Sequence, residues 1–82
     1  MLLEYDNHKY ELLFGSDTIS DGVYLEMNDI NDGIPSNTET VLFAFRSSAD
    51  NRFTFQCFRQ ELPLALVEIF IQEARKNLLA SK

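Results

Sequence analysis

The sequence of 82 residues contains one cysteine, one histidine and no tryptophan. A single cysteine excludes a disulfide within the chain, and one cysteine with one histidine offers too few ligands for a structural zinc site. No apolar run approaches the roughly 18 residues that span a bilayer, and no basic-then-apolar leader opens the chain. We therefore expect a cytoplasmic protein without a metal, a cofactor or a membrane segment.

Basic residues are scarce as well. Seven Lys and Arg stand against 13 Asp and Glu, the formal net charge is −6, and no basic residue occurs between Lys9 and Arg46. This balance opposes nucleic-acid binding. One interpretation is an acidic face that steers a basic protein partner, and the other is a set of solvated loops that keep the chain soluble. The residues assigned to such a face are Asp17, Asp21, Glu26, Asp29, Asp32 and Glu39.

Catalytic motifs are missing too: the chain has no glycine-rich phosphate loop and no HExxH, GxSxG or CxxC sequence. We expect His8 in an exposed turn and Cys57 on an apolar strand face, with nothing that brings them together. The segment 28–39 partly matches a calcium loop through Gly33, but Ile30 occupies a ligand position and cannot coordinate. The sequence therefore predicts a protein that is not an enzyme.

Small size limits the core. A domain of this length buries about 60% of the surface that its unfolded chain exposes, so one core supplies only ~3–5 kcal/mol of stability. With disulfides and metals disfavoured, the remaining means of support are a dense aromatic core and a partner subunit. Seven Phe and three Tyr favour the first.

Apolar and polar residues alternate with a period of two through most of the chain, which predicts strands. Asp6-Asn7 has turn chemistry, and the five residues 47–51 between two Phe-rich runs predict a hairpin whose phenylalanines lie in the core. We expect an α+β fold, an antiparallel meander of four or five strands with one C-terminal helix packed on one face. The predicted strands are Leu2–Tyr5, Lys9–Phe14, Val23–Asn28, Thr40–Arg46 and Arg52–Phe58.

The predicted helix follows Pro63, which suits a helix start because it lacks an amide proton. No Gly or Pro interrupts residues 64–80. Steps of 100° per residue predict a core-facing stripe made of Leu64, Val67, Phe70, Ile71, Ala74 and Leu78. A second apolar strip, Leu62, Leu66 and Ile69, lies on the side of the helix away from this stripe. It is either the interface of a homodimer or a set of ordinary apolar residues that a bent helix tucks in.

Together these features predict one domain over residues 1–82 that acts as a small, acidic, non-catalytic protein-interaction or accessory domain, homodimeric and with a basic partner. One alternative is an immunity protein or antitoxin that neutralises a toxin. The other is a small-ligand binder with an aromatic-lined pocket between sheet and helix or between protomers.

Overall fold

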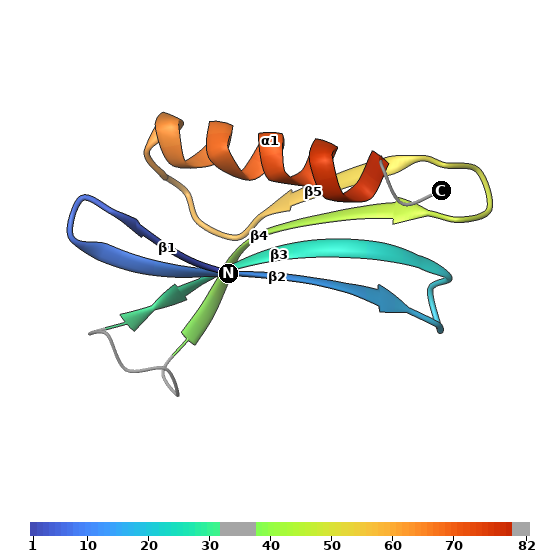
Figure 1. Cartoon of the computed structure of the whole chain (residues 1–82), viewed down its shortest axis with the longest axis horizontal. Coiled ribbons are helices and arrows are strands. Elements are labelled where there is room, and N and C mark those ends of the chain that lie inside the picture. The colour runs from blue at the N-terminus through green and yellow to red at the C-terminus, as the bar shows by residue number, and fades with distance from the viewer. Residues whose placement is uncertain (32–37, 80–82) are drawn as a thin grey trace.

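A computed structural model describes residues 1–31 and 38–79 of the chain. It contains a five-stranded antiparallel sheet in the order β1-β2-β3-β4-β5, and the helix α1 lies along one face of this sheet (Figure 1). The predicted α+β meander is therefore confirmed, with five strands rather than four. The elements are β1 (Leu2–Tyr5), β2 (His8–Asp17), β3 (Gly22–Ile30), β4 (Thr38–Ser47), β5 (Phe53–Cys57) and α1 (Leu64–Leu79).

Short polar turns fix the order of the strands. Asp6 and Asn7 join β1 to β2 with φ angles of 53° and 61°, in the left-handed region that Asp and Asn tolerate better than most residues. At the β2–β3 turn, the Asp17 carboxylate accepts hydrogen bonds from the amides of Ile19 and Ser20 at 3.0 and 3.2 Å. These local contacts hold neighbouring strands in register without help from a long loop.

A β-bulge interrupts the pairing of β3 with β4. Met27 pairs with Leu42, but Asn28 pairs with Thr40, so Val41 is an extra residue in β4. A bulge bends its strand and increases the local twist. Beyond it, the ends of β3 and β4 diverge from α1 (Figure 1), and this divergence sets the position of the polar cluster described below.

The core lies between α1 and the covered face of the sheet and consists mainly of aliphatic side chains. Phe70 is its one fully buried phenylalanine among the described residues, and its ring lies 6.1 Å from that of Phe55. The buried residues of this core are Tyr10, Leu12, Leu25, Met27, Val41, Leu42, Ala44, Leu66, Phe70, Ala74 and Leu78.

The predicted aromatic core is wrong for most of the strand phenylalanines. Phe53 and Phe55 are exposed because β5 is an edge strand with no neighbour on its outer side. Phe43 and Phe45 alternate with buried core residues of β4, so they lie on the sheet face turned away from α1, where they are half-buried. On that open face Tyr24 stacks on Phe43 with ring centroids 5.6 Å apart.

Helix α1 is rotated relative to its predicted orientation. Leu66 and Phe70 are fully buried, whereas Leu64 and Ile71, both assigned to the core stripe, are exposed. The buried residues follow an i, i+4 row from Leu66 to Leu78, which amounts to a rotation of about 50° at 100° per residue. The rotation follows from the sheet: β1 and β2 cover one flank of the helix with additional apolar side chains, while the short edge strand β5 leaves the other flank open.

Candidate functional site

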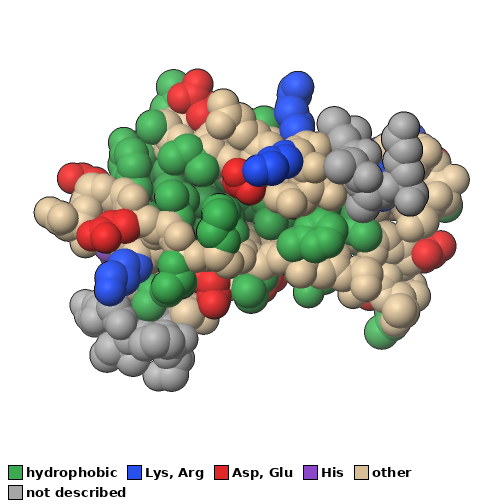
Figure 2. Space-filling view, in the orientation of Figure 1, with side chains coloured by type: hydrophobic (Ala, Val, Ile, Leu, Met, Phe, Trp, Pro, Cys, Tyr) green, Lys and Arg blue, Asp and Glu red, His purple; other side chains and the backbone are tan. Residues whose placement is uncertain are grey.

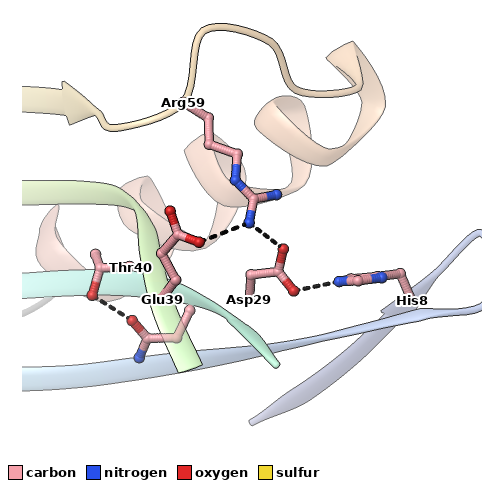
Figure 3. Close-up of polar contacts among 6 residues, drawn as sticks. His8, Asp29, Glu39, Thr40 and Arg59 are labelled. Atoms are coloured by element: carbon pink, nitrogen blue, oxygen red, sulfur yellow. Dashed lines mark hydrogen bonds and ion pairs between the residues drawn. The ribbon is translucent and has the colours of Figure 1, made fainter. Parts of the chain in front are cut away.

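A cluster of charged side chains lies where the ends of β3 and β4 meet the segment that follows β5 (Figure 3). Its centre is Asp29, whose side chain is 2% exposed. One carboxylate oxygen contacts Nε2 of His8, and the other lies 2.5 Å from the Arg59 guanidinium, which also binds Glu39 at 3.2 Å. The cluster therefore connects four parts of the chain.

Strand register explains how these residues meet. Asp29 pairs with Tyr10 on β2 and with Glu39 on β4, just beyond the bulge. Next to it, the hydroxyl of Thr40 donates to the Asn28 side-chain oxygen at 2.6 Å. Arg59 reaches the same place because the chain turns back toward the sheet after β5.

The cluster shifts two pKa values. Burial lowers the pKa of Arg59, but its hydrogen bonds to Asp29 and Glu39 outweigh this effect, so the pKa lies above its usual value and the guanidinium stays charged. Burial, together with the nearby charge of Asp29, raises the pKa of the Tyr10 phenol above 10.0. The buried Asp29 carboxylate therefore lies beside a guanidinium that stays positively charged.

Both oxygens of Asp29 are occupied, so this carboxylate is poorly suited to accept a proton from a substrate. His8, predicted to lie exposed in the first turn, is instead bound to Asp29. The Cys57 thiol donates to the backbone carbonyl of Arg59 at 3.1 Å rather than to His8. These contacts favour a structural role: the cluster fixes the connector between β5 and α1, and through it the start of the helix.

The six acidic residues assigned to a partner face do not share one surface. Asp17 and Asp21 lie at the turn before β3, whereas Asp29 and Glu39 lie at its far end, about 26 Å away at 3.3 Å per strand residue. The prediction is wrong for Asp29, which is buried and bound to His8 and Arg59.

The other members of that set have separate environments. Glu26 lies on the open face and accepts a hydrogen bond from Asn28 at 3.3 Å. Glu39 is exposed but is bound to Arg59. Asp32 lies outside the described residues, as does half of the segment compared with a calcium loop. Where side chains are described, no group of three or more His, Cys, Asp or Glu residues could hold a metal ion.

The helix strip proposed as a dimer interface is wrong in its central residue. Leu66 is fully buried in the core, and Leu62 is half-buried and packs against the same core. Ile69 is also half-buried. Figure 2 shows hydrophobic side chains gathered between the first half of α1 and the β1–β2 hairpin, where they close this flank of the core.

The opposite flank of α1 carries an apolar groove that sequence reasoning missed. A groove of about 430 Å³ runs between α1 and the outer strands β4 and β5. Its floor is Ala44 and Phe70, and Phe53 and Phe55 form its outer wall. Its lining residues are Ala44, Phe53, Thr54, Phe55, Phe70, Ile71, Ala74 and Arg75.

Strand β5 borders this groove and is one of the two edges of the sheet. All five of its residues, Phe53–Cys57, are exposed, and none is charged. Sheet edges are usually blunted by charged residues, proline or a covering segment, because open edges pair with other chains. The uncharged run Phe-Thr-Phe-Gln-Cys is the sequence signal for such an open edge, but its alternation of apolar and polar residues also fits a strand with one face in the core.

Comparisons with models of protein families, with curated proteins and with solved structures give no match. Within residues 1–31 and 38–79, no helix has the length and apolar character needed to cross a membrane. The functional interpretation therefore depends on the geometry of the groove and of the edge strand.

Proposed function

We propose that this chain is a small protein-interaction domain that binds an extended segment of a partner protein along the outer edge of β5. An extended segment adds to an open sheet edge through backbone hydrogen bonds, and its alternate side chains enter neighbouring pockets, which supply specificity. The observation that carries the proposal is the coincidence of an uncharged, exposed edge strand with an apolar groove beside it.

The groove favours particular side chains on that segment. Its walls are apolar apart from Thr54 and Arg75, so it suits one or two large apolar side chains. Arg75 is exposed at the rim and favours an acidic group nearby. The bound segment is therefore expected to alternate apolar residues with polar ones and to carry a carboxylate near one end.

A small apolar ligand is the second candidate, because the groove volume lies within the range of ligand pockets. The protein segment fits better, since the groove is bounded on one side by an exposed edge strand and has few polar groups to orient a small molecule. The proposal of a basic partner has less support, because the acidic residues are dispersed and Asp29 is buried. Neutralisation of a toxin stays a prediction that no contact in the structure favours.

Site-specific photocrosslinking tests the proposal. A photoreactive phenylalanine analogue replaces Phe55 in the full chain inside the source cells, and a control chain carries it at Phe14, which has the same 51% exposure. We expect a protein adduct at position 55 that is absent or much weaker at position 14. No protein adduct at position 55, or equal adducts at positions 55 and 14, would contradict the proposal. Saturable binding of a small apolar molecule to the groove of the purified protein would favour the second candidate.

A further inference from the structure

The outer edge of β5 presents the backbone groups of Phe53, Phe55 and Cys57. Arg52 and Phe58, which flank the strand, form backbone hydrogen bonds with β4 of 3.0 and 2.9 Å. Because hydrogen bonding alternates along an antiparallel strand, the residues at even positions face β4 and those at odd positions face outward. Phe53, Phe55 and Cys57 are thus the positions able to pair with an added strand.

The flank of α1 beside this edge carries a self-complementary set of side chains. Leu64, Glu68, Ile71 and Arg75 follow one another at spacings of four, three and four residues, so they share one side of the helix. Ile71 and Arg75 line the groove. Glu68 and Arg75 are exposed, and neither forms an ion pair with any residue in the described ranges 1–31 and 38–79.

We propose that the occupant of the β5 edge is a second copy of this chain, related by a two-fold axis through Phe55. The inference rests on the proposed function and names the partner. Antiparallel pairing places Phe55 opposite Phe55 of the second copy, and Phe53 opposite Cys57. These are the positions whose backbone groups face outward, so each facing pair exchanges two hydrogen bonds and the sheets join into one.

The same axis accounts for the groove and the charges. Because it stands perpendicular to the joined sheet, both α1 helices lie on one face and run antiparallel. Phe53 and Phe55 of both copies then fill the space between the helices. Glu68 of each copy lies toward Arg75 of the other, so charges that lack a partner within one chain become complementary across the interface.

The exposed area is sufficient for a dimer of modest size. Phe53, Phe55 and Ile71 are each about half exposed, and a phenylalanine can bury about 200 Å². With the backbone edge and the helix flank added, each copy contributes somewhat less than the roughly 800 Å² of a standard interface. The dimer is therefore expected to form at micromolar rather than nanomolar concentration.

Sedimentation velocity on the purified full chain at about 5 to 200 μM tests the inference. We expect wild type to shift from monomer to dimer over this range. Phe55→Glu places two like charges on the axis and should weaken association at least about 30-fold, whereas Phe14→Glu should leave it unchanged. A monomer at all concentrations, or equal weakening by both variants, overturns the inference.

Phe55 also contacts Phe70, so a second set of variants separates association from folding. Phe55→Cys in a Cys57→Ser background should form a disulfide-linked dimer on mild oxidation, because facing strand residues lie within disulfide range. Phe14→Cys in the same background should stay monomeric. Glu68→Arg should weaken the dimer, and adding Arg75→Glu should restore it. Equal disulfide crosslinking at positions 55 and 14, or no restoration by the second charge change, overturns the proposed geometry.

Photocrosslinking at position 55 distinguishes this inference from the broader proposal. An adduct of twice the 9.5 kDa chain mass supports both. A monomer in sedimentation with an adduct to a different protein overturns the second-copy inference and leaves the interaction function standing. A monomer that also gives no adduct at position 55 overturns both.

Discussion

Replacing Asp29 with alanine should destabilise the fold by about 3 kcal/mol. The change removes the carboxylate that His8 and Arg59 bind, and each hydrogen bond to a charged group is worth about 1.5–3 kcal/mol. The side chains of Arg59 and His8 are 31% and 42% exposed, so water and Glu39 replace part of what they lose. We therefore expect a value nearer the lower end of the 3–5 kcal/mol typical of a broken buried pair.

For a domain of 82 residues this loss corresponds to a fall in Tm of roughly 15 °C. Urea denaturation followed by circular dichroism measures it, with Glu39→Ala as the control. Glu39 is an exposed partner of the same arginine, so its removal should cost no more than about 0.5 kcal/mol. If Asp29→Ala lies within 1 kcal/mol of wild type, or matches the control, the cluster does not anchor the connector and the reasoning is refuted.

Three further predictions follow from local contacts. In urea denaturation, Leu66→Ala should lower the free energy of unfolding by about 3 kcal/mol, and Leu64→Ala should lower it by less than about 0.5 kcal/mol. A larger loss for Leu64→Ala than for Leu66→Ala would favour the helix orientation predicted from the sequence. Burial of Tyr10, then the charge of Asp29, raises the pKa of its phenol above 10.0. The stabilisation that the neutral phenol gives the fold is therefore full below that pH and is lost as the pH rises. Urea midpoints should fall more steeply above pH 10 in wild type than in Tyr10→Phe, and parallel curves would contradict this. Hydrogen bonds from the backbone amides of Ser20 and, to a lesser degree, Ile19 lower the pKa of Asp17 below 3.8. The stabilisation that the Asp17 carboxylate gives the fold is therefore present above that pH and is lost in acid. Asp17→Ala should be less stable than wild type near neutral pH, and a difference that persists at about pH 2 would contradict the assignment.

The strands and the helix could be predicted because their signals are local. Alternation of apolar and polar residues marks a strand wherever one face is buried, and Asp6-Asn7 indicates its turn through backbone chemistry alone. The meander order follows from short connections between neighbouring strands. None of these inferences requires knowledge of which flank of an element is covered.

The helix orientation and the exposure of the phenylalanines could not be predicted, because both depend on what lies beside an element. Leu66 and Leu64 are equally apolar, and the cover supplied by β1 and β2 decides which one is buried. Phe55 carries the pattern of a core residue, and its exposure follows from β5 being the last strand of the sheet. A single sequence does not reveal where a sheet ends.

The charged cluster falls between these two cases. Val23, Leu25 and Met27 are the apolar members of an alternating pattern in β3, and continuing that alternation by one more step places Asp29 on the same inward side. A carboxylate at an inward position requires a buried partner, and this signal could have removed Asp29 from the acidic face. Its partner Arg59 lies 30 positions along the chain, and only the return of the chain after β5 brings the two together.

The two edges of the sheet differ in a way that bears on the proposed dimer. The β1 edge is four residues long and includes Glu4, which discourages pairing. The β5 edge has no charge, and covering the exposed half of Phe55 removes about 100 Å² of apolar surface from water, or about 2.5 kcal/mol. Phe53 adds a similar amount, so the four phenylalanines of a dimer supply about 10 kcal/mol. That sum lies within the 4–15 kcal/mol cost of association, so the backbone pairing and the Glu68–Arg75 charges decide the outcome, and reversing the charge of Glu68 alone tests the contribution of that pair.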